Sequence, residues 1–182
     1  MPTTDTYVAL LRGINVGGKH IVPMKELVQI FTEAGCLNVR TYIQSGNVVF
    51  NASAKVVKDL PKAIASKIEE GYGFWSPVVL RSRDELALAT RRNPFLKTGL
   101  PEQTLYVYFL ADEPSAAAAK TLDPQRSAPD KFHVTSREIY LHLPNGMGRT
   151  KLTNAYFDSK LKTVATARNW ATVRKLLEMM QT

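Results

Sequence analysis

The spacing of apolar residues divides the first half of the chain into alternating strand-like and helix-like segments. Residues 7–12 are a short apolar run of β type, and residues 23–34 carry apolar side chains at helical spacing. Residues 39–50 hold two runs of β-branched and aromatic residues around Ser45-Gly46-Asn47, which predicts a hairpin because Gly and Asn tolerate positive φ. A second helical stripe ends at Gly71, and a strand at residues 77–81 follows. The order β-α-β-β-α-β is that of a ferredoxin-like unit.

The second half repeats this order. Residues 82–92 predict a linking helix, and the Pro- and Gly-containing segment RNPFLKTGLP marks a boundary. The elements expected after it are a strand (104–110), a short helix (115–122), a hairpin around Ser136-Arg137 (131–143), a helix (154–161), a strand (163–167) and a closing helix (170–180). We therefore predict an α+β protein of two ferredoxin-like (α/β-plait) units with antiparallel sheets, plus a C-terminal helix. The domains would be residues 1–92 and 93–182.

Composition restricts the class of protein. The chain has 182 residues, of which 45% are hydrophobic, enough for a real core. No apolar run approaches the roughly 20 residues that span a bilayer, no signal peptide is visible, and Cys36 is the single cysteine. We expect a cytoplasmic protein with no membrane partner, no metal and no cofactor. The oligomeric state is left open.

The charge changes this picture, because it is unevenly spread. The formal net charge is +8, and residues 145–182 hold seven basic residues against two acidic ones. A basic end attracts phosphate esters, nucleic acid or acidic proteins, although a solvated helix face explains it as well.

A glycine-rich segment near the N-terminus, GINVGGK (13–19), has the G-x-x-x-x-G-K spacing of a P-loop. His20 follows where that motif needs Ser or Thr, and the next helix is expected only at Pro23. P-loop proteins also build parallel sheets, whereas this chain predicts hairpins. We therefore expect no P-loop, although the turn can still hold an anion through its backbone N–H groups.

The predicted topology brings separate loops to one sheet edge. The end of the first strand, the hairpin between the second and third strands and the start of the fourth would meet there, with Tyr72, Phe74 and Trp75 beside them. Converging cations, amides and aromatics are typical of a binding site. The candidate ligand-binding residues at this edge are Arg12, Asn15, Gly17, Gly18, Lys19, Gln44, Ser45, Gly46 and Asn47.

The same argument predicts a second cluster in the second unit. The segment NGMGRTK (145–151) would lie near the segment ARNW (167–170). The candidate ligand-binding residues of this cluster are Lys151 from the first segment and Arg168, Asn169 and Trp170 from the second. Helix capping and a tryptophan core anchor are the structural alternative, and the two interpretations carry equal weight.

A third candidate is one face of the second predicted sheet. Alternation suggests that Tyr106, Tyr108, His133, Tyr140 and His142 share a face opposite the aliphatic residues. RNA-recognition modules stack bases on such aromatics, but SREIYLHL lacks their signature. Packing against the first unit or the closing helix is the preferred interpretation of this face.

Catalytic signatures are weak. The sequence has no H-E-x-x-H, C-x-x-C or G-x-S-x-G motif, and its three histidines have no metal-ligand spacing.

Four long strings carry a family resemblance: YVALLRGINVGGKHIVPMKEL, TYIQSGNVVF, GRTKLTNAYFDSKL and TARNWATVRKLLE. They resemble a bacterial family known as domain-of-unknown-function family 1697. The resemblance implies two α/β-plait units and no assigned activity. Its motifs coincide with both loop clusters, Arg12 to Lys19 with Gln44 to Asn47, and Gly148 to Lys151 with Arg168 to Trp170.

These observations favour a binding protein for an anionic ligand, either a phosphate-bearing small molecule or nucleic acid. Arg12, Lys19, Lys151 and Arg168 would pair with negative charge, and Trp75 or Trp170 would stack on a ring. An alternative is an enzyme, a transferase or hydrolase acting on a phosphorylated substrate, with His20 or a water as proton carrier. A protein-interaction module is the third interpretation.

Overall fold

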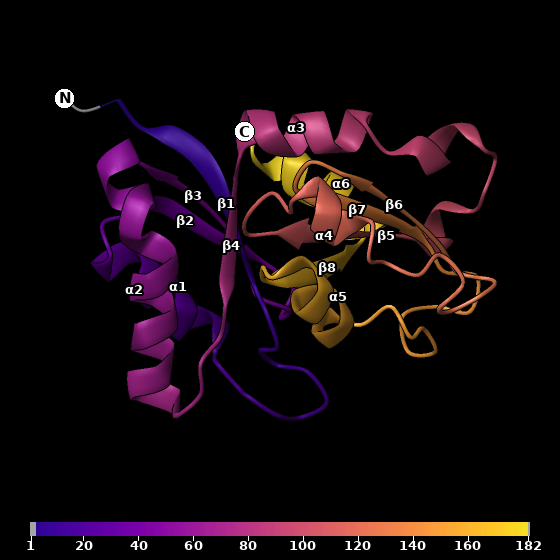
Figure 1. The fold of residues 1–182 in the computed structure, drawn as a ribbon. Helices are drawn as coiled ribbons and strands as arrows, with labels where there is room; N and C mark the ends of the chain where they lie inside the picture. Colours follow the sequence, from indigo (N-terminus) through magenta and orange to yellow (C-terminus); the bar gives the residue numbers. More distant parts are fainter. Residues whose placement is uncertain (1–2, 182) are drawn as a thin grey trace. The chain divides into compact units, whose positions relative to one another are not determined.

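The computed structural model describes residues 3–181 and divides the chain into two compact units (Figure 1). Unit 1 comprises residues 1–87 with the C-terminal residues 176–182, and unit 2 comprises residues 88–175. Whether these compact units are separate domains, with the boundary predicted between residues 92 and 93, stays a prediction.

Unit 1 has the predicted βαββαβ order and is followed by the linking helix. Its elements are β1 (Asp5–Leu11), α1 (Met24–Glu33), β2 (Leu37–Tyr42), β3 (Asn47–Ala52), α2 (Ala54–Tyr72), β4 (Val78–Ser82) and α3 (Arg83–Arg91). The strands form one antiparallel sheet in the order β2-β3-β1-β4, the expected ferredoxin-like order. Figure 1 shows α1 and α2 side by side on one face of this sheet.

The core of unit 1 lies between that face and the two helices. Ala9 and Leu11 of β1 and Phe50 of β3 meet Phe31 of α1 and Ile64 of α2, all at most 1% exposed. Burial of the leucine, isoleucine and phenylalanine side chains stabilises the unit by about 1.5–3 kcal/mol each. This packing fixes the end of the sheet at which one glycine-containing loop follows β1 and another joins β2 to β3.

Helix α2 is longer than its apolar stripe alone predicts. The Ser53 hydroxyl accepts a hydrogen bond from the Val56 N–H and caps the first turn, and the helix continues through Pro61. It ends at Gly73, which adopts a left-handed conformation with φ 78°. Residues 74–77 then lead directly back to the sheet.

Unit 2 repeats the architecture with shorter helices. Its elements are two 3₁₀ turns, η1 (Pro94–Lys97) and η2 (Glu102–Thr104), then β5 (Leu105–Leu110), α4 (Ala116–Ala119), β6 (Lys131–Thr135), β7 (Glu138–His142), α5 (Asn154–Leu161), β8 (Ala165–Asn169) and α6 (Trp170–Met179). The antiparallel sheet has the order β6-β7-β5-β8. The fold is therefore α+β with two ferredoxin-like units and a C-terminal helix, as predicted.

The core of unit 2 is aromatic. Phe157 of α5 is fully buried, with its ring centroid 4.9 Å from that of Tyr108 and 6.1 Å from that of Phe132. The Tyr108 hydroxyl donates to the Leu152 carbonyl oxygen over 3.0 Å, so the polar end of this buried ring is satisfied.

The register of this sheet corrects the predicted tyrosine and histidine face. Tyr106 lies opposite Leu141 and Tyr108 opposite Ile139, whereas Tyr140 lies opposite Val107. Because cross-strand partners share a face, Tyr106 and Tyr108 are on the helix-covered side and Tyr140 is on the other. His133 pairs with Tyr140, and His142 with Leu105, so they share the second face. The expected single aromatic face does not exist.

Neither set of tyrosines is an open stacking platform. Tyr108 is 2% exposed and Tyr140 fully buried, and the Tyr140 hydroxyl donates to the Ala89 carbonyl oxygen of α3 over 2.7 Å. The packing interpretation of Tyr140 is therefore correct, with the end of α3 as the partner that this contact identifies. None of the helices in the described part of the chain combines the length and apolarity that crossing a membrane requires.

Candidate functional site

The glycine-rich segment after β1 folds into a miniature β-hairpin. The Asn15 N–H donates to the His20 carbonyl oxygen, and the Lys19 N–H donates to the Val16 carbonyl oxygen, both over 3.0 Å. Gly17 and Gly18 form the turn with φ of 58° and 72°, the left-handed pair that a two-residue hairpin turn needs. Lys19 thus belongs to a hairpin arm, and α1 begins only at Met24, so the segment is not a P-loop.

Asn15 ties this hairpin to the loop between β2 and β3. Its Nδ2 donates to the Gln44 carbonyl oxygen over 2.9 Å and to the Val22 carbonyl oxygen over 3.0 Å. Its Oδ1 accepts from the Val22 N–H over 2.8 Å. The structure therefore brings residues 12–19 beside residues 44–47, as the topology predicted. Asn15 itself is a structural clamp, since its amide is occupied.

The segment between α2 and β4 lines the other side of the hairpin. The His20 ring stacks on the Phe74 ring with centroids 4.2 Å apart, and His20 Nδ1 lies 3.0 Å from the Gly13 carbonyl oxygen. The Arg12 carbonyl oxygen accepts from the Ser76 hydroxyl, and the Arg12 N–H donates to the Pro77 carbonyl oxygen. These contacts hold His20 in place and do not support its assignment as a proton carrier.

The loop residues 45–47 also have structural roles. Asn47 is fully buried, and its Nδ2 donates to the Tyr42 carbonyl oxygen and to the Ser45 hydroxyl. The Gly46 carbonyl oxygen accepts from the Leu11 N–H over 2.8 Å. A Cβ on Gly46 would lie 2.8 Å from the Leu11 Cβ, so a side chain does not fit there. The Asn47 side-chain amide and the Gly46 carbonyl oxygen are therefore used inside the protein, where they hold the loop in shape.

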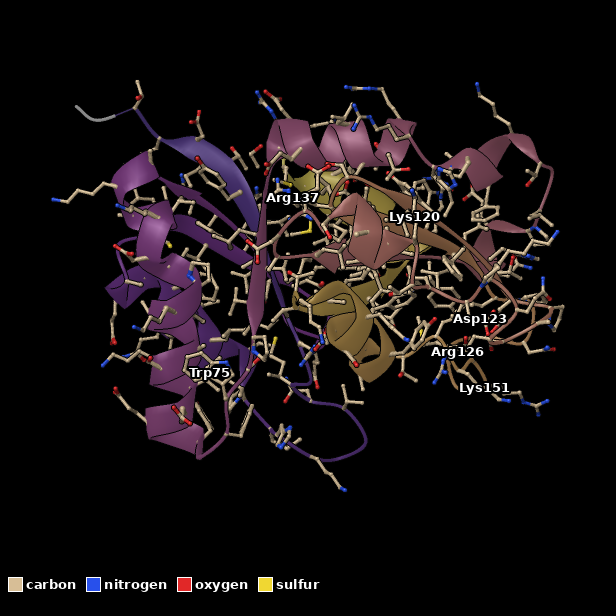
Figure 2. The ribbon with its side chains drawn as sticks, in the orientation of Figure 1. Trp75, Lys120, Asp123, Arg126, Arg137 and Lys151 are labelled. Atoms are coloured by element: carbon tan, nitrogen blue, oxygen red, sulfur yellow. The ribbon has the colours of Figure 1, made fainter. Side chains whose placement is uncertain are left out.

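What remains available to a ligand is the tip of the hairpin and the side chains around it. Gly17, Gly18 and Lys19 are exposed. Four apolar side chains from the same three segments are also exposed, namely Val16 (61%), Ile21 (56%), Ile43 (52%) and Trp75 (48%). We call residues 16–21 with Ile43 and Trp75 the hairpin surface. Figure 2 shows Trp75 at the end of α2.

Ile43 adds backbone strain to this surface. Its φ is 49°, a left-handed conformation that a β-branched residue adopts only at a cost of about 1–3 kcal/mol. Sequence reasoning missed Val16, Ile21 and Ile43 because an isolated apolar residue in a loop does not by itself indicate exposure. Val16 and Ile21 belong to the hairpin segment, and Ile43 belongs to the loop between β2 and β3.

The predicted second cluster is only partly assembled. The chain segments do meet at one sheet end, since the Leu143 N–H donates to the Thr104 carbonyl oxygen and Asn169 pairs with Tyr106. The Lys151 backbone, however, is bound by the loop 123–130. Its N–H donates to the Ser127 hydroxyl, and its carbonyl oxygen accepts from the Arg126 Nε over 3.0 Å.

Arg126 is the cation that sequence reasoning missed beside Lys151. Its guanidinium lies over the Tyr156 ring, 4.1 Å from the centroid, and Figure 2 shows Arg126 and Lys151 projecting from neighbouring loops. The Tyr156 hydroxyl oxygen accepts from the Asp123 N–H over 2.8 Å. No motif links residues 126 and 156, so only the fold reveals the pair.

Arg168 and Trp170 are buried, as the structural alternative for this cluster predicts. Arg168 donates to the Thr166 hydroxyl and to the Ala167 carbonyl oxygen, and burial lowers its pKa to about 10. Trp170 is 3% exposed, so it is a core anchor. Asn169 caps α6, because its Oδ1 accepts from the Thr172 N–H over 2.8 Å. These contacts agree with the structural alternative for the three residues, and their assignment as ligand-binding residues stays a prediction.

The remaining reactive groups do not assemble a catalytic centre. Burial raises the pKa of the Cys36 thiol to about 11, so the thiolate is scarce at neutral pH. Burial and the adjacent Glu26 carboxylate raise the pKa of Tyr72 to about 12. No group of three or more His, Cys, Asp or Glu residues within the described part of the chain is arranged to hold a metal ion.

Comparisons with known proteins agree with the fold and supply no activity. The model of a protein family of unknown function, DUF1697, matches residues 4–140. It spans the hairpin surface and ends before the segments around Lys151 and Arg168. No curated protein matches the sequence. A solved structure of conserved bacterial protein SP0830 from Streptococcus pneumoniae is similar with a TM-score of 0.74 and 24% identity, over 99% of this chain and 100% of that one.

Proposed function

The chain belongs to the DUF1697 family of unknown function, and from its surface chemistry we propose that it is a cytoplasmic protein that binds single-stranded nucleic acid through the hairpin surface. The observation that carries this proposal is the exposed Lys19 on a glycine hairpin, together with the exposed Trp75 ring in the segment whose Phe74 stacks on His20 of the same hairpin. Phosphate binding needs a cation, and sequence-tolerant base binding needs an aromatic face. This surface offers both.

An extended ligand fits this surface better than a single nucleotide does. Gly17, Gly18 and Lys19 lie at the exposed tip of a hairpin, whereas small-molecule sites bury most of their ligand. A strand can run along an open surface and gain from several weak contacts. The net charge of +8 supports the same preference, because it attracts a polyanion over a long range.

Trp75 makes the proposal directly testable by fluorescence. The protein has two tryptophans, and Trp170 is 3% exposed while Trp75 is 48% exposed. Titration with oligo(dT) of about 15 nucleotides should quench the Trp75 emission by stacking. Iodide should quench the same residue in the free protein and lose access to it in the complex.

Two substitutions separate stacking from charge. Trp75→Ala should weaken binding by about 1–3 kcal/mol because the stacking platform is lost. Lys19→Gln should weaken it less and reduce the salt slope, since one phosphate contact contributes about 0.7 to the slope for a single strand. Lys58→Gln is the matched control, because it removes one exposed charge at the opposite end of α2.

The outcome can also exclude the proposal. Binding that is absent at low salt, or that Trp75→Ala, Lys19→Gln and Lys58→Gln weaken equally, would contradict a role for the hairpin surface. Binding of free nucleotides with the same affinity as oligo(dT) would indicate a small phosphate-bearing ligand instead. Binding of a protein partner at this surface without any affinity for oligo(dT) would assign the exposed apolar residues to an interaction module.

A further inference from the structure

Unit 2 contains a hollow that none of the predicted site residues line. Its volume is about 420 Å³, which is within the range of small-molecule sites. Three separate segments form its wall: the 3₁₀ turn after α3, the loop before β6, and β6 itself. The residues that the argument needs are Pro94, Phe95, Pro124, Phe132, Lys131 and His133.

The wall is apolar and rigid. Two prolines lie in two of the three segments, and proline fixes the backbone φ, which keeps the hollow preformed. Phe95 contributes aromatic surface to this wall, whereas the Phe132 ring lies on the opposite face of β6 and is anchored against Phe157 with ring centroids 6.1 Å apart. A planar ring would therefore bury apolar area here without a large rearrangement of the wall.

One rim of the hollow carries two basic residues. Lys131 and His133 lie two residues apart on β6 and therefore on the same face of the strand, and both are exposed. The neighbouring Asp130 carboxylate accepts from the Ser127 hydroxyl over 2.7 Å, so part of its hydrogen-bonding capacity is used inside the loop. An anionic group on a ligand would find the Lys131 ammonium at the edge of the apolar wall.

Two buried polar atoms lie next to Phe95, behind this wall. Asn93 is 4% exposed, and its Oδ1 accepts from the Phe95 N–H over 3.0 Å while its Nδ2 has no hydrogen-bond partner among the described residues. The His142 ring centroid is 6.3 Å from that of Phe95, and within the same residues His142 Nδ1 is also unpartnered. Buried polar atoms are normally satisfied, so their concentration at Phe95 distinguishes this wall from ordinary packing.

We propose that this hollow binds a small planar aromatic carboxylate, whose ring packs between Phe95 and Pro124 and whose carboxylate pairs with Lys131. The site is independent of the hairpin surface, since all its residues belong to unit 2. A ligand with a ring and no charge would lose the Lys131 contact, and a carboxylate without a ring would lose the apolar contact. The ligand therefore needs both the aromatic ring and the carboxylate.

The experiment is a titration of the full-length, ¹⁵N-labelled protein with 2-naphthoate, followed by amide chemical shifts. Saturable shifts should concentrate on Phe95, Thr98, Gln125 and Lys131. The neutral analogue 2-naphthamide and the non-aromatic cyclohexanecarboxylate should each bind more weakly. Lys131→Gln should weaken binding of 2-naphthoate roughly five-fold, as expected for an exposed ion pair, while Lys120→Gln, an exposed lysine of unit 2 outside the hollow (Figure 2), should leave it unchanged.

A second variant keeps the proposal falsifiable if the charge effect is small. Thr98→Trp places a large ring at the exposed mouth of the hollow and should abolish the shifts without unfolding the protein. The proposal is overturned if 2-naphthoate gives no saturable shifts at millimolar concentration or shifts residues outside the hollow. Equal effects of Lys131→Gln and Lys120→Gln, or unchanged binding by Thr98→Trp, would overturn it as well.

Discussion

The two units share one backbone frame and differ at the sheet end where β1 and β5 finish. In unit 1 the Leu11 N–H donates to the Gly46 carbonyl oxygen, and in unit 2 the Leu110 N–H donates to that of Arg137, both over 2.8 Å. The next residue of each strand, Arg12 or Ala111, donates to the start of its fourth strand over 2.9 Å. The two units therefore have equivalent backbone hydrogen bonds at this end of the sheet, and they differ in the side chains found there.

At this end unit 1 carries a glycine hairpin with Lys19, and unit 2 carries acidic residues. The Glu113 carboxylate accepts from the Ser136 hydroxyl, and the Asp112 carboxylate accepts from the Thr163 hydroxyl. Unit 2 instead extends its loops on either side of β6 and β7, at residues 120–130 and 143–153. The comparison teaches that a repeated fold does not repeat its binding surface, because loop length and charge vary independently of strand order.

The largest expected effect concerns the two cores. Phe157→Ala in unit 2 and Phe31→Ala in unit 1 each remove a fully buried ring and should lower the free energy of unfolding by about 3–5 kcal/mol. Helices α3 and α6 each contribute residues to both units. We therefore expect one cooperative transition in urea, shifted by either substitution. Two transitions, of which each variant moves only one, would instead support separate domains at residues 92 and 93.

A smaller effect should distinguish the two hairpin loops. Gly46→Ala places a Cβ 2.8 Å from the Leu11 Cβ at φ 78°, so both overpacking and backbone strain should destabilise the protein, by about 2–4 kcal/mol. Gly13→Ala is the control, because it has a similar φ of 75° and open space around it, and should cost only about 1 kcal/mol. Thermal unfolding of both variants checks the difference, and equal losses would contradict the close approach at Gly46.

A smaller change in stability should come from the N-terminal caps of α3 and α6, the helices that follow the fourth strand of each unit. Ser82 and Glu85 form a reciprocal capping box before α3, whereas Asn169 caps α6 by accepting from the Thr172 N–H. Asn169→Ala and Ser82→Ala should each lower the free energy of unfolding by about 1 kcal/mol, as measured in urea. A much larger loss for Asn169→Ala, together with lost ligand binding, would reopen its interpretation as a site residue.

The smallest effect is a pH dependence specific to unit 2. Burial, and then the Lys131 charge, lower the pKa of His142, while Asp130 acts in the opposite direction. Below the ordinary value of about 6.5 the unfolded chain binds the proton first, so stability should fall as pH decreases from there towards the lowered pKa. A His142→Gln variant should have a flatter profile below pH 7. NMR titration of the His142 ring gives the direction independently, and a pKa above the ordinary value would contradict it.

Strand order and element positions were predictable from the sequence because each element carries its own periodic signal. The hairpin around Ser45-Gly46-Asn47 and the helix at residues 154–161 are where the pattern placed them. The face of each strand was harder. Alternation identifies two faces within one strand, but only the register, such as Tyr108 opposite Ile139, relates the faces of neighbouring strands.

The sequence predicted which loops lie close together at the candidate site. It did not predict which side chains of those loops are used in contacts inside the protein. Asn15 and Asn47 have the residue types of ligand contacts, yet their amides are used inside the protein. Arg168 shows the same difficulty, because a basic residue in a short strand can point to either face. Its equivalent in unit 1, Arg81, is 1% exposed and also donates to the preceding carbonyl oxygen, so an alignment of the two units would have indicated a structural arginine.

The closed base of the miniature hairpin has a practical consequence for protein engineering. The Asn15–His20 and Val16–Lys19 hydrogen bonds fix both arms, and nothing lies within 4 Å of a Cβ built at Gly17 or Gly18. A foreign peptide spliced between these glycines would leave the scaffold through two anchored stems and meet only solvent. The turn is thus a natural graft point for an epitope or a fluorophore-bearing tag.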